Sequence, residues 1–530
     1  MASLEEIKND VSKKEKPTYK DYDELLEESL KEKRERSFSD SFKERTNYTT
    51  TEKGATAHKT TESDLLDFFA QGGAMRHRDK QDIVSMFDVA FQEDPRLALK
   101  TLFYFRDIRG GQGERRIFRT AIEYLAGSQP EAIRENINLI PEYGRWDDIY
   151  ALFDTQLEEE AAQLIKEQLE KDWDSENPSL LAKWLKSENA SSNETKRLGN
   201  KTRKYLDMTH RQYRKMLSRL REKINVVEKK MSRNDWEDIN YEKVPSKAGL
   251  IYKNAFERND PERYKEYLER LEKGEANVNS DTLYPYELVN KAFKTDLTTS
   301  DRTYLNEAWR QLPDYIDGEE NAIAVVDTSG SMSMGDKSPQ PKDVALSLGL
   351  YMAERNKGEF HNKFITFSNQ PEMIEVKGSN FVQKVKNMWG AHWDGTTDIV
   401  AVFDLILDIA LENDYTQKML PNRLYIISDM EFDMATSSWN SPKVNKTLFE
   451  KIENRYNSHD YDMPNLVFWN VNARNKQFPM KKDKRGVQLI SGCSPSIFEA
   501  TMKGEFMTPY EFMVSVIDSE RYKPVTLGGE

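Results

Sequence analysis

Two patterns of apolar residues divide the chain. Over residues 61–293, segments such as DLLDFFAQ, DIVSMFDVAFQ, RLALKTLFYFRDI and IFRTAIEYLA place apolar residues three or four positions apart, as amphipathic helices do. Glycine and proline separate these segments at short intervals, which is typical of short helices joined by short connections. We therefore predict stacked helix pairs, an α-solenoid, over this range.

From residue 321 the apolar residues form short runs separated by helical stretches. The runs are NAIAVVDTSGS, KFITFS, RLYIISDM, NLVFWNVNA and GVQLISG, and helical stretches such as VALSLGLYMAERN and DIVAVFDLILDIALEN lie between most of them. Strands that alternate with helices predict a mostly parallel sheet covered on both faces. The predicted fold class is therefore α plus α/β, with a doubly wound α/β domain over residues 321–493.

Three further segments complete the predicted organisation. Residues 1–60 mix acidic and basic side chains with few apolar ones, so we expect a charged, partly disordered segment. Residues 294–320 are expected to connect the two halves. Residues 494–530 are expected to form a C-terminal helical segment that returns to the helical half.

Charge is distributed unevenly along the 530 residues. The net charge is -13, which argues against a uniformly basic nucleic-acid-binding protein. Residues 181–230 nevertheless hold 15 Lys and Arg against five Asp and Glu. Within them, THRQYRKMLSRLREKI (209–224) predicts a helix with one apolar stripe, Tyr213, Leu217 and Leu220, and a basic remainder.

The sequence also bears on the compartment. It contains one cysteine, Cys493, so no internal disulfide can form. The first residues, MASLEEIKND, lack the apolar region of a signal peptide, and no stretch approaches the roughly 20 apolar residues of a membrane helix. We therefore expect a cytoplasmic or virion-associated protein with no membrane partner.

Oxygen-bearing side chains occur in three loops of the predicted α/β domain. The first run ends in Asp327-Thr328-Ser329-Gly330-Ser331, the segment Gly395-Thr396-Thr397-Asp398 opens a helix, and RLYIISDM carries Asp429 near its end. Ligands of such sheets bind at the carboxyl ends of the strands. A set of carboxylates and hydroxyls suits Mg²⁺ or Mn²⁺. The alternative is that DTSGS forms only a turn and a helix N-cap, which Ser and Asp also favour.

These three loops, in this order, resemble the metal-ion-dependent adhesion site of von Willebrand A domains, and the resemblance covers the whole C-terminal third. It implies one divalent cation held by a defined set of residues. Asp429 would bind directly or through water, and Thr396 is the alternative to Thr397. The implied metal ligands are Asp327, Ser329, Ser331, Thr397 and Asp429.

The helical half carries a second resemblance. TLFYFRDIRGGQGER (101–115) and EYGRWDDI (142–149) resemble the TROVE module of the Ro autoantigen ribonucleoprotein, and more closely its bacterial and phage relatives. SENASSNETKRLGNKTRKYL (187–206) and TLYPYELV (282–289) extend the resemblance, which covers about residues 60–530. It implies a monomeric ring of HEAT-like repeats closed by a von Willebrand A domain. Such a ring binds small structured RNA on its outer face and single-stranded RNA ends through its basic hole.

The basic segment offers candidate contacts to RNA phosphates, each of which would add salt-dependent affinity. Trp184, Tyr205 and Tyr213 lie nearby in the sequence and could stack on unpaired bases. The alternative is a solvated helix face with the aromatic residues in the core. The candidate RNA-binding residues are Lys196, Arg197, Lys201, Arg203, Lys204, Arg211, Arg214 and Lys215.

Two turns of the helical half have structural interpretations. Arg106, Asp107, Arg109 and Arg115 surround glycines and could hold a phosphate, but a helix–helix corner with internal ion pairs is favoured. The second turn, over residues 143–147, likewise indicates a packing corner with an N-cap.

No catalytic set is evident, so we do not expect an enzyme. The sequence lacks a Walker A loop, a G-x-S-x-G elbow and an H-E-x-x-H helix. His392 lies near the Thr397 loop, and the acids Asp429, Glu431 and Asp433 leave a metal nuclease as a remote alternative. The predicted function is an RNA-binding ring protein of Ro type. The alternative is a metal-dependent protein-interaction scaffold, associated with a phage particle, whose partner supplies an acidic residue to the ion.

Overall fold

A computed structural model describes most of the chain, in two units, Met1–Thr49 and Thr50–Glu530. Of the predicted segment 1–60, nearly all residues that precede Asn47 lie outside the described residues. The structure below is that of the second unit. The described ranges are 43, 46–224, 226–280, 283–316, 321–333, 338–368, 370–391, 397–433, 448–504 and 506–527.

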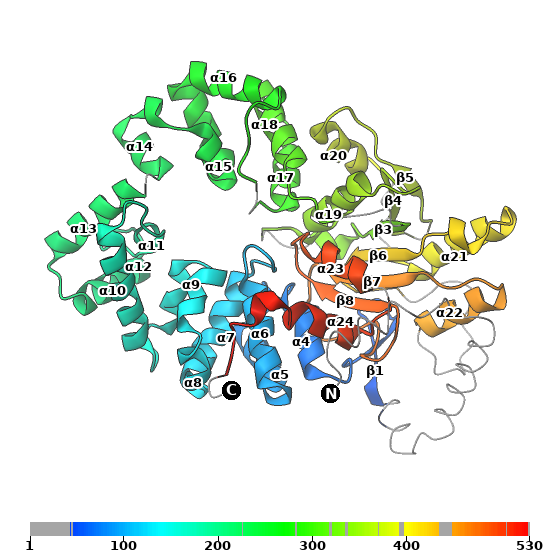
Figure 1. The fold of residues 1–530 in the computed structure, drawn as a ribbon. Coiled ribbons are helices and arrows are strands. Elements are labelled where there is room, and N and C mark those ends of the chain that lie inside the picture. The colour runs from blue at the N-terminus through cyan, green and yellow to red at the C-terminus, as the bar shows by residue number, and fades with distance from the viewer. Residues whose placement is uncertain are drawn as a thin grey trace. The chain divides into compact units, whose positions relative to one another are not determined.

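The first part of this unit is helical, as the apolar spacing predicts, and the helices follow one another in chain order from blue to green in Figure 1. Short strands, β1 (Tyr48–Thr50) and β2 (Thr56–His58), precede them. The helices are α4 (Asp64–Gly72), α5 (Lys80–Glu93), α6 (Pro95–Arg106), α7 (Arg115–Ser128), α8 (Pro130–Arg134), α9 (Ile140–Tyr143), α10 (Glu158–Asp174), α11 (Leu181–Trp184), α12 (Asn193–Tyr205), α13 (His210–Lys223), α14 (Val227–Arg233), α15 (Ser246–Asn259), α16 (Pro261–Glu272), α17 (Pro285–Ala292) and α18 (Thr299–Arg310).

Helix α13 shows how sequence determines local structure here. Thr209 caps its N-terminus, and the Gln212 side chain accepts a hydrogen bond from the Thr209 N–H at 2.8 Å. The predicted stripe is confirmed, because Tyr213, Leu217 and Leu220 are all buried.

The predicted connector 294–320 contains a helix, α18. The carboxylate of Asp301 accepts hydrogen bonds from the backbone N–H and the hydroxyl of Thr298, both at 2.8 Å, which closes a capping box. Helix α18 then packs against α16 and α20. The chain therefore continues as packed helix as far as Arg310.

The C-terminal part is an α/β domain with six strands, β3 (Ala322–Val326), β4 (Lys363–Thr366), β5 (Met373–Glu375), β6 (Arg423–Ser428), β7 (Asn465–Asn470) and β8 (Val487–Ser491). Their order is β5-β4-β3-β6-β7-β8, and every neighbouring pair is parallel except β4 and β5. The mostly parallel sheet is confirmed. Strand β5 was not predicted, because this partly exposed three-residue edge strand has no apolar run.

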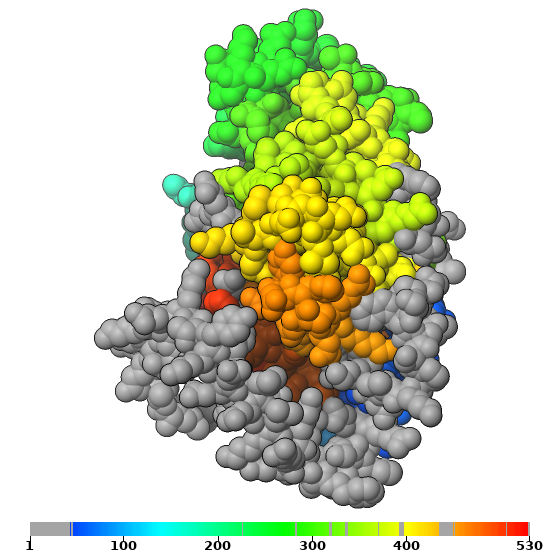
Figure 2. Space-filling model, turned by 90° about the vertical axis from the view of Figure 1, so that its right-hand side faces the viewer, coloured from blue at the N-terminus to red at the C-terminus, as the bar shows by residue number. Residues whose placement is uncertain are grey.

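Helices cover both faces of the sheet, namely α19 (Pro341–Arg355), α20 (Phe381–Trp389), α21 (Ile399–Glu412), α22 (Leu448–Ser458), α23 (Ile497–Lys503) and α24 (Pro509–Ile517). Successive side chains of a strand point to opposite faces. Accordingly, Phe468 packs against Phe449 of α22 at 4.9 Å between ring centroids, while Trp469 packs against Phe498 of α23 at 4.8 Å. Helices α21 and α22 contact each other, and Figure 2 shows their yellow and orange segments side by side on one surface.

The helical half contacts the α/β domain at both of its ends (Figure 1). At the first end, α4 packs against β8 and α24, and α24 also reaches α6. At the other end, α17 and α18 pack against α19 and α20. No helix among the described residues is both long and apolar enough to cross a membrane.

The carboxyl of Asp67 in α4 predicts a pH dependence of stability. Burial raises its pKa from 3.8 to about 7, although it accepts a hydrogen bond from the Thr61 N–H at 2.7 Å. The folded state therefore holds a proton that the unfolded state releases, so the free energy of unfolding should fall as pH rises from about 4 to about 7. The total loss is on the order of 4 kcal/mol.

Urea unfolding at pH 5 and pH 8 measures this loss. Asp67→Asn should remove most of the decrease between the two pH values, because the amide keeps an acceptor for Thr61 but does not titrate. Asp79→Asn, at an exposed aspartate just before α5 that does not act on Asp67, is the matched control and should keep the decrease. An equal decrease in wild type and Asp67→Asn would show that another group is responsible.

Candidate functional site

The register of the sheet brings two of the three oxygen-bearing loops together. Strands β3 and β6 are parallel neighbours in which Val326 pairs with Ile427. The next residue, Asp327, donates its backbone N–H to the carbonyl of Ile427 at 3.1 Å. Asp327 and the loop after β6 therefore lie side by side at the carboxyl edge of the sheet.

The segment DTSGS forms a tight turn around the Asp327 carboxylate. One oxygen accepts the Ser329 N–H at 2.8 Å, and the other accepts the Ser428 hydroxyl at 2.6 Å. The hydroxyls of Ser329 and Ser331 lie 3.1 Å apart. Asp327 is fully buried, and burial is the main reason why its carboxyl pKa is raised.

Asp429 brings a second buried carboxylate to the same edge. It accepts the Glu431 N–H at 3.2 Å and an Arg474 N–H at 3.1 Å. Burial, and next the negative charge of Asp327, raise the Asp429 pKa from 3.8 to about 6, while Arg474 and a hydrogen bond from Ser331 act in the opposite direction. Met430, which follows Asp429, has a left-handed backbone with φ of 64°, which is strained for methionine.

Thr397 supplies the third loop. Its buried hydroxyl donates to the Glu431 carbonyl at 2.8 Å and accepts a hydrogen bond from Lys53 at 3.0 Å. Backbone bonds tie the same loop down, since Asp433 N–H donates to the Thr397 carbonyl at 3.1 Å. Thr396, the alternative ligand, and His392 lie outside the described residues.

The five sequence-derived metal candidates thus lie in adjoining loops, linked by hydrogen bonds or by charge. Together they offer two carboxylates and three hydroxyls, an oxygen-only set that fits a hard divalent cation. No cluster of three or more His, Cys, Asp or Glu suited to a metal occurs in the described part of the chain. An ion held here would therefore depend on the hydroxyls as well as on Asp327 and Asp429.

The eight RNA-binding candidates separate into two groups on α12 and α13. Arg197, Lys201 and Arg203 form ion pairs with Asp154, Glu158 and Glu188 at 2.7, 2.7 and 2.9 Å. The other five form no ion pair among the described residues. Lys196 is half-buried, and the remaining four are exposed: Lys204, Arg211, Arg214 and Lys215.

The three aromatic candidates also differ. Tyr213 is buried and donates its hydroxyl to the Lys186 carbonyl at 2.9 Å, and Trp184 lies 4.0 Å under the guanidinium of Arg145. Tyr205 is 41% exposed, so it is the one of the three whose ring is accessible to a base.

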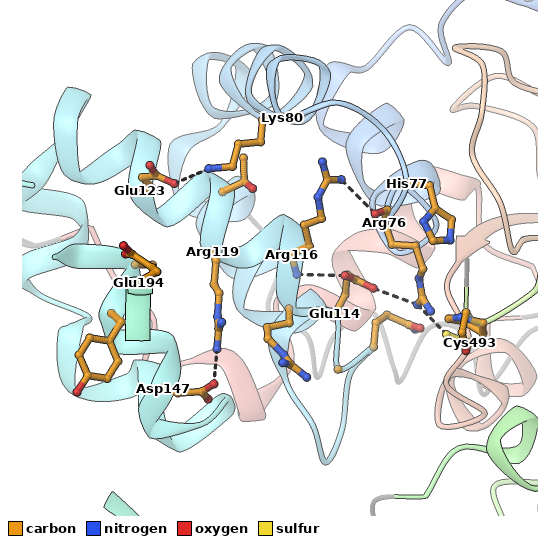
Figure 3. Close-up of a pocket in the computed structure, with 18 of the residues that line it drawn as sticks. Arg76, His77, Lys80, Glu114, Arg116, Arg119, Glu123, Asp147, Glu194 and Cys493 are labelled. Atoms are coloured by element: carbon orange, nitrogen blue, oxygen red, sulfur yellow. Dashed lines mark hydrogen bonds and ion pairs between the residues drawn. The ribbon is translucent and has the colours of Figure 1, made fainter. Parts of the chain in front are cut away.

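A pocket of 730 Å³ was not anticipated from the sequence (Figure 3). Its wall includes Arg115, Arg116 and Arg119 of α7 together with Lys186. Arg119 pairs with Asp147 at 2.8 Å, whereas no acidic partner lies within 4.0 Å of Arg115, Arg116 or Lys186 among the described residues. Burial lowers the Lys186 pKa most, the nearby Asp147 carboxylate raises it, and neighbouring arginines lower it further. Close spacing of three arginines along one helix was the available sequence signal.

Arg106, Asp107 and Arg109, which lie beside the glycines, form the helix–helix corner with internal ion pairs that the sequence favoured. Arg106 pairs with Asp148 at 2.7 Å, and Arg109 donates to the Glu142 carbonyl at 2.9 Å. Asp107 accepts an N–H of Arg521 at 2.7 Å, which ties the C-terminal segment to α6. Arg115 is the exception, because it lines the pocket instead.

Comparison with known proteins matches both halves of the chain. The family described as a domain of unknown function, DUF2828, matches residues 51–178 and 178–321, and the domain of unknown function DUF7788 matches residues 321–523. An uncharacterized protein of Acanthamoeba polyphaga mimivirus is 31% identical over 528 residues, covering 91% of this chain and 90% of its own length. The similarity therefore spans the helical half, the sheet and the candidate site together.

Proposed function

The chain belongs to the DUF2828 family and ends in a DUF7788 domain, and from this premise we propose that it is a metal-dependent binding protein of von Willebrand A type, built as a ring. The ring is supported by the contacts that the helical half makes with the α/β domain at both ends. The observation that carries the function is the meeting of two buried carboxylates and three hydroxyls at the carboxyl edge of the sheet.

In this proposal Asp327, Ser329, Ser331 and Thr397 hold one Mg²⁺ or Mn²⁺ ion, with Asp429 bound directly or through water. The ion would offset the cost of burying two acids of like charge. Few charged ligands would leave it electrophilic, with a coordination position open for an oxygen of a partner. An Asp or Glu of a partner protein is the ligand that such an ion would accept.

Direct measurement of Mn²⁺ binding to the full chain tests the metal site, for example by electron paramagnetic resonance of free Mn²⁺. Ser331→Ala should weaken binding at least about tenfold, the factor that corresponds to about 1.4 kcal/mol. Ser333→Ala changes an exposed serine of the same turn and is the matched control. Wild type that leaves Mn²⁺ free at millimolar protein would exclude the proposal.

RNA binding is the second candidate, and the pocket favours it. Arg115 and Arg116 line the pocket and take part in no ion pair between described side chains, in a chain of net charge -13. The acids Glu114, Glu123, Asp147 and Glu194 line the same pocket, and Asp147 lies near Lys186. Phosphates of single-stranded or small structured RNA would complement the two arginines, and each neutralised phosphate adds salt-dependent affinity. The exposed residues Arg211 and Lys215 provide a separate basic surface.

Filter binding of single-stranded RNA across a salt series separates these two surfaces. Neutralising Arg115 and Arg116 together as Gln should lower affinity and reduce the salt slope by roughly one to two. Neutralising Arg211, Arg214 and Lys215 should lower affinity only if RNA binds the basic surface of α13. Lys265→Gln, on the exposed face of α16, is the control. Absence of binding at low salt would exclude the RNA candidate.

A further inference from the structure

A turn at residues 51–55 is fixed against the loop that follows β6. The Thr51 hydroxyl donates to the Phe432 carbonyl at 2.6 Å, and the Glu52 N–H donates to the Glu431 carboxylate at 3.0 Å. The Glu52 carboxylate in turn pairs with Arg474 at 3.1 Å. These contacts join positions more than 370 residues apart in the chain, so the turn is part of the site's wall.

Lys53 of this turn reaches the proposed metal ligands. Its ammonium donates to the Thr397 hydroxyl at 3.0 Å and lies 3.9 Å from an oxygen of Asp433. Its positive charge also lowers the pKa of the Asp327 carboxyl, against the larger effect of burial. A single lysine thus supplies positive charge at the place where the divalent cation is proposed.

The Lys53 ammonium and a divalent cation would compete at the Thr397 hydroxyl. A hydroxyl has one proton and two lone pairs. The proton is donated to the Glu431 carbonyl, and Lys53 takes a lone pair. One lone pair remains, but a metal ion bound to it would lie close to the ammonium, and in this partly desolvated place the two positive charges would repel each other strongly.

We propose that Lys53 is the internal cation of this site, which a divalent ion must displace, and that it thereby sets the site's selectivity for divalent over monovalent ions. The inference rests on the proposed metal function. Na⁺ or K⁺ would replace one unit charge by another and gain nothing, whereas Mg²⁺ or Mn²⁺ adds a charge beside two buried carboxylates. The Lys53 side chain is 26% exposed, so it can swing into water while the turn stays in place.

Lys53→Met in the full chain tests the proposal, because methionine keeps the apolar stem and removes the charge. Mn²⁺ affinity should rise by about tenfold or more, and excess Na⁺ should now compete with Mn²⁺ more strongly than in wild type. In EDTA the variant should melt at a lower temperature than wild type, and saturating Mn²⁺ should remove that difference. Lys59→Met, an exposed lysine just after β2, is the control and should change none of these.

The outcomes separate this inference from the metal site itself. Equal or weaker Mn²⁺ affinity in Lys53→Met, with wild type binding, would overturn the role of Lys53 and leave the site standing. If neither protein binds Mn²⁺, the proposed function and the inference both fall. An affinity gain without any change in Na⁺ competition would contradict the selectivity role.

Discussion

Asp148→Ala is expected to lower the free energy of unfolding by about 3 to 5 kcal/mol, because it leaves a buried arginine without its counter-ion. The Arg106 side chain is 2% exposed and the Asp148 side chain is fully buried. Asp148 accepts hydrogen bonds from Arg106 and Arg119 at 2.7 and 2.6 Å, and from the Arg145 backbone N–H at 2.8 Å. Urea unfolding measures the loss.

The matched control is an ion pair of the same kind at the surface. Glu131→Ala breaks the exposed pair with Arg134 and should cost less than about 1 kcal/mol. Replacing both partners of the buried pair, as Arg106→Met with Asp148→Leu, should recover part of the loss, since no uncompensated charge remains. A cost below about 1 kcal/mol for Asp148→Ala would mean that water reaches Arg106.

This pair also explains why the two segments that resemble the TROVE module belong together. Arg106 lies in TLFYFRDIRGGQGER and Asp148 in EYGRWDDI, 42 positions apart. Gly144 is required between them, because a Cβ at that position would lie 2.4 Å from the Asp148 carboxylate and 2.8 Å from Arg106. Arg106, Gly144 and Asp148 therefore hold a corner of the helical half.

Much of the fold could be predicted because it depends on local pattern, whereas the metal candidates rest on the resemblance of three loops to von Willebrand A domains. Apolar spacing distinguishes helices such as α13 from strands such as β3 and β6. Parallel strands then place the residues that follow them at one edge, which is why Asp327 and Asp429 meet. The pairing of β3 with β6 does not follow from the order of elements along the chain, because β4 and β5 lie between them in the sequence.

Contacts between distant segments could not be predicted in this way. Lys53 reaches Thr397 across 344 positions, from a turn with no apolar pattern. Similarly, the number of basic residues over 181–230 gives no information on acids of other elements. The pairing of Lys201 with Glu158 of α10 could therefore not be predicted. Charge that is neutralised by tertiary contact looks free in a sequence.

Asp327→Asn is expected to abolish stabilisation by metal while leaving the metal-free protein at least as stable as wild type. A ligand at 100 times its dissociation constant stabilises the folded state by about 2.7 kcal/mol, and the variant should lose this gain. Without metal, the substitution removes one of two buried negative charges, both of which burial disfavours. The amide oxygen still accepts the Ser329 N–H. Urea unfolding of wild type and of Asp327→Asn, each in EDTA and in saturating Mn²⁺, gives the four free energies of unfolding that are compared.

The sign of this result decides between the two interpretations of DTSGS. If Asp327 were only a turn and capping residue, asparagine, which caps as well as aspartate, would leave stability unchanged in both conditions. If folding required the charge itself, both values would fall. A loss confined to the Mn²⁺ condition is the outcome that only a metal ligand produces. Asp404→Asn is the control, since the Asp404 carboxylate pairs with Arg455 of α22 at 2.6 Å. The stability that this substitution costs should be the same with and without metal.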